Sequence, residues 1–195
     1  MDVMLPGLPP MQALLFDERS RPDFRQVFGT LAERADDIAA AVTRVRLTTV
    51  DLTGDELRGV ARFRVLVTEL NALRLDGEVR GMDSDPRRAV NVALLRDMLE
   101  SGRMEVRSAP LGGWSPDFTV FGAAGTPFAV MCGFHWFERP YPHRGPALTA
   151  VHFGDGARLA AKRHEELWRS AHDVGPAVWS ILARARGTVG VVDSG

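Results

Sequence analysis

The 195-residue sequence contains almost no lysine, cysteine or net charge. Its one cysteine, Cys132, excludes an intramolecular disulfide and cannot form a zinc site alone. A formal net charge of −1 gives the whole chain no electrostatic signature of a nucleic-acid or membrane-surface protein, although a local basic patch is compatible with it. Lys162 is the only lysine among 24 basic residues, so any mechanism that requires a lysine must use this one.

Signals for export, membrane insertion and nucleotide binding are also absent. The opening residues lack the basic and apolar regions of a signal peptide, and no apolar run approaches the ~18 residues of a transmembrane helix. Neither G-x-x-x-x-G-K-[ST] nor G-x-G-x-x-G occurs, and Ser115 has no G-x-S-x-G elbow around it. We therefore expect a cytoplasmic protein that requires no cofactor and does not act at a membrane.

The composition predicts one soluble globular domain. Hydrophobic residues make up 45% and charged residues 25% of the chain, which is ordinary for a domain with a real core. We expect an irregular N-terminal arm over residues 1–22, in which MQALLFDE forms a short strand. One domain then spans residues 23–186, and a flexible glycine-rich tail spans 187–195.

Hydrophobic periodicity predicts the order of the elements. Apolar residues spaced three and four positions apart predict a helix over residues 23–42. Alternation of apolar and polar residues, together with many β-branched side chains, predicts a strand over 43–52. Residues 53–75 fit either one helix or a helix that breaks into a strand at RFRVLVT. The turn-rich LDGEVRGMDSDPRR predicts a solvated loop, in which Asp83 and Asp85 would bind a cation only weakly. Further helices are predicted at 90–100, 157–172 and 176–186, and strands in MEVRSA, DFTVFG, FAVMCGFHWF and ALTAVHFG.

This order of elements predicts an α/β sandwich, in which a mixed β-sheet has helices on both faces. DFTVFG and FAVMCGFHWF are joined by a short AAGT linker and should form a hairpin. Trp168 and Trp179 stand among helical apolar residues and are therefore predicted to lie in the core.

The segments LLRDMLESG, MEVRSAP, DFTVFG, FAVMCGFHWF and AAKRHEELWRSA follow one another in an order that resembles one half of the phospholipase D superfamily fold. The same order is similar to the non-catalytic, effector-binding version of that fold in TrmB-type regulators. The helix ending from His164 to Trp168 is the most suggestive part. Phospholipase D-type folds usually place two such halves face to face, so the resemblance implies a homodimer or an equivalent protein partner.

One departure from the family pattern decides the expected chemistry. Phospholipase D-type enzymes use H-x-K-x-x-x-x-D, in which the histidine is the covalent nucleophile and the lysine holds the phosphate. The equivalent window here, residues 114–121, reads WSPDFTVF and has no histidine and no lysine. The resemblance therefore implies a degenerate member of the superfamily, without catalytic residues and leaning away from an enzyme.

The histidines do not form an obvious metal site. Cys132 and His135 are three positions apart, which places them on opposite faces of a strand. His164 and His172 share a predicted helical stripe with Trp168, as expected of residues that pack against a sheet. No closely spaced pair of ligands results from this geometry, so we expect no metal.

The segment HWFERPYPHRG concentrates aromatic, histidine and arginine side chains at the end of a core strand. Such a group suits stacking and contact with an anionic ligand or a nucleic acid. The alternative is a proline-stiffened surface loop whose aromatic rings cover the end of the sheet. The candidate ligand-binding residues are His135, Trp136, Glu138, Arg139, Tyr141, His143 and Arg144.

Three functions are consistent with the sequence. The first is a non-catalytic phospholipase D-like module for binding or interaction, as a subunit or regulator in a bacterial regulatory or defence complex. The second is a phosphodiesterase or nuclease in which His135 or His143 works with Glu138 and Arg139 in a rearranged site. The third is a small-molecule sensor, as the likeness to the regulators implies.

Overall fold

The computed structural model describes residues 13–16, 24–42, 55–68, 70, 72–80, 86–109, 118–132 and 149–184. In this part of the chain, eight strands form one sheet in the order β1-β7-β6-β5-β2-β3-β4-β8. The strands are β1 (Ala13–Phe16), β2 (Asp37–Val42), β3 (Arg62–Val67), β4 (Met104–Ser108), β5 (Phe118–Ala123), β6 (Thr126–Cys132), β7 (Thr149–Phe153) and β8 (His172–Asp173). The helices are α1 (Phe24–Ala32), α3 (Ala72–Arg80), α4 (Pro86–Glu100), α5 (Asp155–Ser170) and α6 (Gly175–Ala183).

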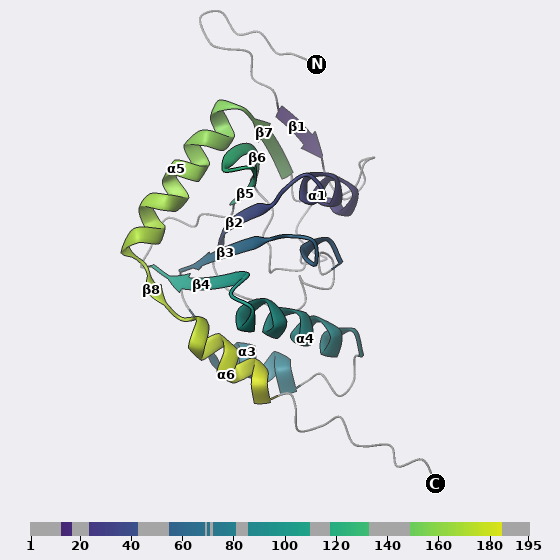
Figure 1. Ribbon diagram of the computed structural model, residues 1–195, viewed down its shortest axis with the longest axis vertical. Helices are drawn as coiled ribbons and strands as arrows, with labels where there is room; N and C mark the ends of the chain where they lie inside the picture. Colours follow the sequence, from purple (N-terminus) through teal and green to yellow (C-terminus); the bar gives the residue numbers. More distant parts are fainter. Residues whose placement is uncertain are drawn as a thin grey trace, which may run out of the picture.

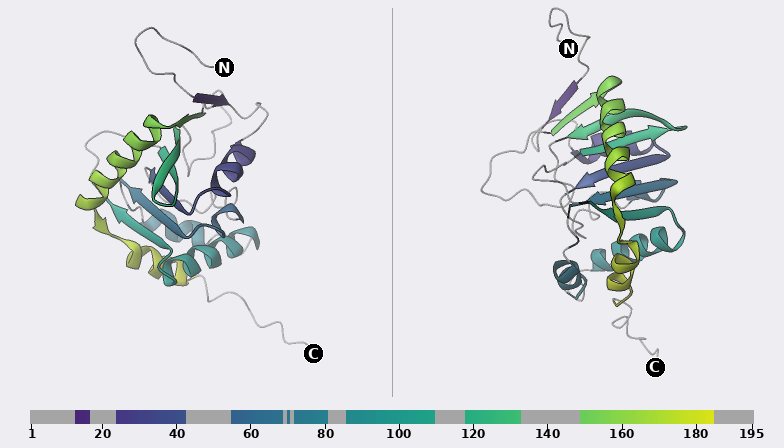
Figure 2. Two further views of the ribbon diagram at one scale, coloured as in Figure 1. Left: turned by 45° about the horizontal axis from the view of Figure 1, so that its top comes forward. Right: turned by 90° about the vertical axis from the view of Figure 1, so that its left-hand side faces the viewer.

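The sheet is mixed, as the sequence predicts. β2, β3 and β4 run parallel to one another, whereas the other neighbouring strands pair antiparallel. Of the described helices, α5 lies across one face, and α1, α3, α4 and α6 lie on the other (Figure 1). Viewed from the α5 side, the helix crosses the strands from β7 towards β4 (Figure 2, right). The prediction of helices on both faces is confirmed.

The two faces differ in the size of the side chains they bury. The larger core contains the rings of Phe28, Phe63 and Phe121, and Phe28 meets Phe121 edge to face at 5.4 Å between ring centroids. Under α5, by contrast, the apolar side chains that β2 contributes to the core are those of Ala39 and Ala41. These small residues leave room for larger side chains that α5 directs at the sheet.

Most of the predicted elements are confirmed. The region 53–75 follows the second of its two alternatives, because a helical turn at residues 55–57 gives way to β3. The short strand in MQALLFDE is β1, which pairs with β7 at the edge of the sheet. The hairpin is formed by β5 and β6, and its turn residues Ala124 and Gly125 both have positive φ, as a tight two-residue hairpin turn requires.

Two of the predicted elements are wrong. The helix expected over 23–42 ends at Ala32, and the remainder forms β2. A strand buried on both faces is apolar at successive positions, so its sequence cannot be told from a buried helix by periodicity. The loop expected in LDGEVRGMDSDPRR begins instead as the end of α3, because Leu75 and Val79 are one helical turn apart and both are buried.

The described helices include none that combines the length and the apolar character needed to cross a bilayer. The strand predicted over 43–52 lies outside the described residues. The proposed division into an arm, one domain and a tail stays a prediction.

Candidate functional site

One end of the sheet gathers the segments in which the sequence places function. β5 begins at Phe118, which is paired with Ala41 near the end of β2 and with Cys132 at the end of β6. β7 begins beside it, since Cys132 is also paired with Ala150. We call this the Phe118 end; the opposite end, where β2 begins and the β5–β6 hairpin turns, is the Asp37 end.

The window that would carry a phospholipase D motif enters the sheet at the Phe118 end. Residues 114–117 lie outside the described residues, and the other four belong to β5. Phe118, Thr119, Val120 and Phe121 are all buried, so this part of the window is a core strand. No side chain in this part of the window is both polar and accessible to a substrate.

The candidate ligand-binding residues His135, Trp136, Glu138, Arg139, Tyr141, His143 and Arg144 lie outside the described residues. The described residues on either side of them, Cys132 and Thr149, both lie at the Phe118 end. The chain therefore leaves the sheet at the end of β6, beside the start of β5, and re-enters it at the start of β7, on the other side of β6. Cys132 is half-buried, and burial raises the pKa of its thiol, which disfavours a reactive thiolate.

His164 is the described histidine that lies next to the window. Its ring is 6.5 Å from that of Phe118 and stacks on Trp168 with 5.5 Å between centroids. The imidazole is only 1% exposed. Desolvation first, and the Arg64 charge second, lower its pKa to about 4, although a backbone hydrogen bond with Ala40 and the charge of Glu165 oppose the shift. His164 is therefore a neutral core residue at pH 7.

The remaining described histidines do not assemble a metal site. His172 lies on β8 and is exposed. The prediction that it shares a helical stripe with His164 and Trp168 is therefore wrong for His172. Within the described ranges, no group of three or more histidine, cysteine, aspartate or glutamate residues could hold a metal ion.

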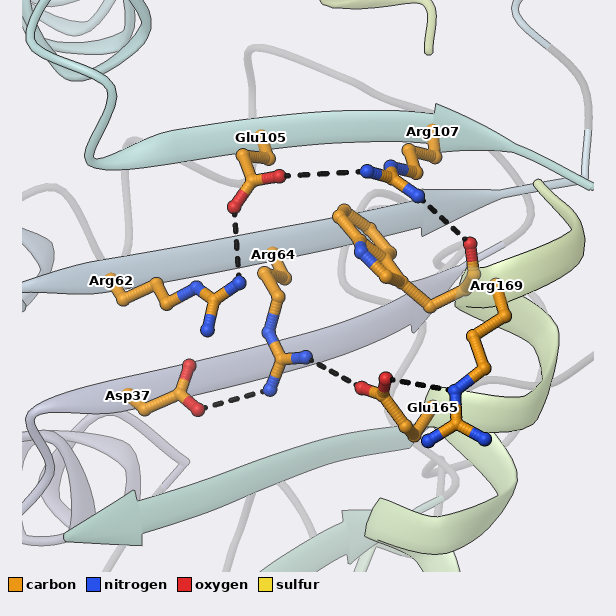
Figure 3. A network of polar contacts seen from close by, with 8 residues as sticks. Asp37, Arg62, Arg64, Glu105, Arg107, Glu165 and Arg169 are labelled. Atoms are coloured by element: carbon orange, nitrogen blue, oxygen red, sulfur yellow. Dashed lines mark hydrogen bonds and ion pairs between the residues drawn. The ribbon is translucent and has the colours of Figure 1, made fainter. Parts of the chain in front are cut away.

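A network of charged side chains crosses the α5 face of the sheet (Figure 3). At its centre, Arg64 on β3 donates from Nη2 to Asp37 Oδ2 and from Nη1 to Glu165 Oε2, each over 3.0 Å. Arg64 therefore ties β2 and β3 to α5. Its side chain is only 14% exposed, so these are its main polar contacts.

Arg107 on β4 makes a second connection to α5. Its Nη1 donates to the backbone oxygen of Trp168 over 3.1 Å, and its guanidinium lies 4.6 Å from the centre of the Trp168 indole. Glu105 pairs with Arg62 at 3.2 Å and approaches Arg107 at 3.9 Å. Trp168 is buried as predicted, whereas Trp179 is 38% exposed and donates its indole N–H to Glu100, so its predicted core position is wrong.

This network was not anticipated from the sequence, although a signal was present. Arg62 and Arg64 alternate with apolar residues in RFRVLV, and Glu105 and Arg107 do so in MEVRS. Period-two charges in adjacent strands fall on one face of a sheet. That pattern could have indicated a polar face, but not the carboxylates that pair with it.

Among the described residues, cavities open on the α5 face of the sheet and at its β4 edge. One, of about 270 Å³, opens between α5 and the sheet at the Asp37 end and is lined in part by Lys162. The other, of about 360 Å³, lies between the outer edge of β4 and the start of α6, beside Trp179. Neither contains Phe118, Cys132 or Thr149 in its walls. The first lies at the Asp37 end, whereas the second lies at the β4 edge of the sheet.

Comparison with known proteins identifies the architecture. No protein-family model and no curated protein matches the sequence. Among solved structures, the chain is similar to a phospholipase D family member, Nuc from Salmonella typhimurium. The similarity covers 84% of this chain and 97% of that one, with a TM-score of 0.51 and 13% sequence identity. The fold is phospholipase D-like. At this level of identity the likeness shows the fold alone.

The phospholipase D-like fold agrees with the resemblance seen in the sequence. The likeness extends well beyond the segments from LLRDMLESG to AAKRHEELWRSA that first suggested it. The similarity to TrmB-type regulators stays a prediction, as does the loss of catalysis.

Proposed function

We propose that this chain is a non-catalytic phospholipase D-like module that acts by binding a ligand or a protein partner. One observation carries the proposal: the fold resembles that of a phospholipase D family member, while the window of residues 114–121 has no histidine and no lysine. Covalent phosphoryl transfer by this superfamily requires an accessible imidazole nucleophile. A chain without one retains a scaffold for recognition.

The neighbouring residues do not replace the missing groups. His164 is next to Phe118 but is buried, neutral and stacked on Trp168, so it cannot attack a phosphodiester in solution. Lys162, the only lysine in the chain, lines a cavity with Asp37 and Gly122 at the opposite end of the sheet. Neither side chain supports a phosphohistidine mechanism at the window.

In this proposal, the ligand or protein partner binds at the Phe118 end of the sheet. The segment with His135, Trp136, Arg139, Tyr141 and Arg144 begins after Cys132 and ends before Thr149, both of which lie there. Aromatic rings and guanidinium groups bind anionic or aromatic ligands and are common anchors at protein interfaces. A role in a bacterial regulatory or defence complex would use this surface.

The second candidate is a phosphodiesterase or nuclease with a rearranged site. It is favoured by the same placement, because His135, Glu138, Arg139 and His143 belong to a segment that starts beside Phe118. Histidine beside arginine can carry out acid–base catalysis on a phosphodiester. This candidate differs from the first in a measurable activity.

Turnover of phosphodiesters tests the two candidates directly. We expect no hydrolysis above the buffer rate with bis(p-nitrophenyl) phosphate, single-stranded DNA or double-stranded DNA, because the nucleophile is absent from the window. The measurement is product release over a pH series, with His135→Ala and His143→Ala measured in parallel. Hydrolysis by the wild-type chain that disappears in either variant would establish the second candidate and exclude the first.

Pairing is the second measurable consequence of the proposal. Phospholipase D-type folds usually act as two halves facing each other, and this chain holds one half. We expect sedimentation velocity at micromolar concentration to show a homodimer, or a pull-down to recover one defined protein partner. A monomer at all accessible concentrations that also recovers no partner argues against an interaction module.

A further inference from the structure

Helix α5 is held against the sheet by few buried side chains. Of its 16 residues, Ala157, His164 and Trp168 are buried. The helix begins after Gly154, which has a positive φ and no side chain that could cap the first turn. A large share of the attachment of α5 to the sheet therefore depends on its two buried rings.

The polar contacts of α5 with the sheet lie close to the same rings. Arg64 on β3 donates to Glu165 over 3.0 Å (Figure 3). Arg107 on β4 donates to the backbone oxygen of Trp168 over 3.1 Å. Both acceptors lie within about one helical turn of His164, so a change at this histidine acts on the part of α5 that is fixed most firmly.

The imidazole of His164 fits this interface only in its neutral form. The ring is 1% exposed and stacks on Trp168, and one of its nitrogens forms a hydrogen bond with the backbone of Ala40. The other nitrogen, Nε2, is buried and has no hydrogen-bond partner among the described residues. A proton at Nε2 would therefore create a buried positive charge with no described acceptor within hydrogen-bond distance.

The charged groups that surround the ring do not offset this cost. Desolvation first, and the charge of Arg64 on β3 second, lower the pKa of His164 to about 4. Glu165 on α5 opposes the shift, but its carboxylate is already paired with Arg64. β5 contributes the uncharged ring of Phe118. β6 contributes Cys132 to this layer, and burial raises the pKa of its thiol, so the thiol stays neutral in acid.

We infer that α5 is a pH-sensitive element, which separates from the sheet when His164 takes up a proton while the rest of the sheet stays folded. In the separated helix the imidazolium is solvated, whereas in the docked helix it would lie next to Arg64 in a desolvated layer. The proton therefore binds the separated form and shifts the population towards it. Separation exposes Phe118, Val120 and Val130, which pack in the same layer as α5. This inference does not depend on the proposed loss of catalysis.

Hydrogen exchange of backbone amides, followed by NMR from pH 7 to pH 4, tests the inference. The protection of each amide is corrected for the intrinsic pH dependence of exchange. We expect the α5 amides to be less protected than the β5 amides at every pH, because α5 opens without the sheet. Their protection should fall about 100-fold between pH 7 and pH 4, as expected for a histidine whose pKa is 6.5 in the open form and about 4 in the docked form.

Two outcomes in the wild type would overturn the inference. Equal protection of the α5 and β5 amides would mean that the helix opens only when the whole fold opens. Unchanged protection of the α5 amides between pH 7 and pH 4 would mean that no proton is taken up on opening. Neither comparison requires a variant.

Substitution of His164 assigns the pH dependence to this ring. His164→Gln cannot take up a proton in this range, so its α5 amides should lose at least about tenfold less protection than those of the wild type. The variant keeps Asp37 and Glu165, so titration of these carboxylates affects both proteins alike. His172→Gln is the matched control, because His172 is exposed on β8, and its α5 amides should behave as in the wild type. Equal losses in the wild type and His164→Gln would overturn the inference.

Discussion

Replacing Arg64 with methionine is expected to lower the free energy of unfolding by about 3 kcal/mol, the loss typical of breaking a largely buried ion pair. Arg64 is 14% exposed and holds Asp37 and Glu165 at 3.0 Å each. Methionine preserves much of the aliphatic volume but leaves the Asp37 carboxylate partly buried without its guanidinium. Urea unfolding at pH 7 measures the effect as a lower midpoint with an unchanged slope.

Arg62 provides the matched control on the same strand and the same face. Its side chain is 52% exposed, and it pairs with Glu105, which is 38% exposed. Exposed ion pairs contribute up to about 1 kcal/mol, so Arg62→Met should have a much smaller effect than Arg64→Met. Similar losses in both variants would mean that burial does not distinguish the two arginines.

A second substitution tests the physical cause. Under one explanation, Arg64→Met loses stability because the Asp37 carboxylate is left without its ion-pair partner. In that case, adding Asp37→Leu should recover part of the stability, since an apolar side chain has no charge to desolvate. If the two losses simply add, then Arg64 acts through packing on Trp168, whose ring centre is 5.9 Å from its guanidinium. The double variant thus separates electrostatics from packing.

Hydrophobic periodicity identifies a strand only where its two faces lie in different environments. Period-two patterns match β4 and β7, in which buried residues alternate with less buried ones. They failed at β2, where DIAAAV is covered on both faces and is apolar at successive positions. The short helix α3 was missed because charged residues and Gly77 separate its buried Leu75 from its buried Val79.

The charged network shows a second limit on what can be predicted from a single sequence. Arg64 lies 27 positions from Asp37 and 101 positions from Glu165, and the strand order brings the three together. A single sequence does not reveal strand order, so the partners of Arg64 could not be named. The resemblance to phospholipase D-type folds depended on element order instead, and it was correct at the level of fold. The ligand-binding role of residues 135–144 stays a prediction.

The acid sensitivity of the fold should depend on His164. Its pKa is lowered from 6.5 to about 4 by desolvation and by the charge of Arg64. Above pH 6.5 the imidazole is neutral in both folded and unfolded chains, so it adds no pH dependence. Between pH 6.5 and 4 only the unfolded chain binds the proton, and stability falls by about 3 kcal/mol as the pH falls. Below pH 4 both states are protonated and the loss is complete.

Unfolding curves at a series of pH values, for the wild type and for His164→Gln, measure this contribution. The variant loses one hydrogen bond at every pH, so it starts less stable, but the difference from the wild type should shrink as the pH falls from 6.5 to 4. His172→Gln is the control, since His172 is exposed on β8 and its removal should leave the curve unchanged. A constant difference between His164→Gln and the wild type would place the acid sensitivity in other groups. It would also remove the argument that His164 is too deeply buried to act as a nucleophile, because an imidazole that takes up a proton near pH 6.5 has access to water.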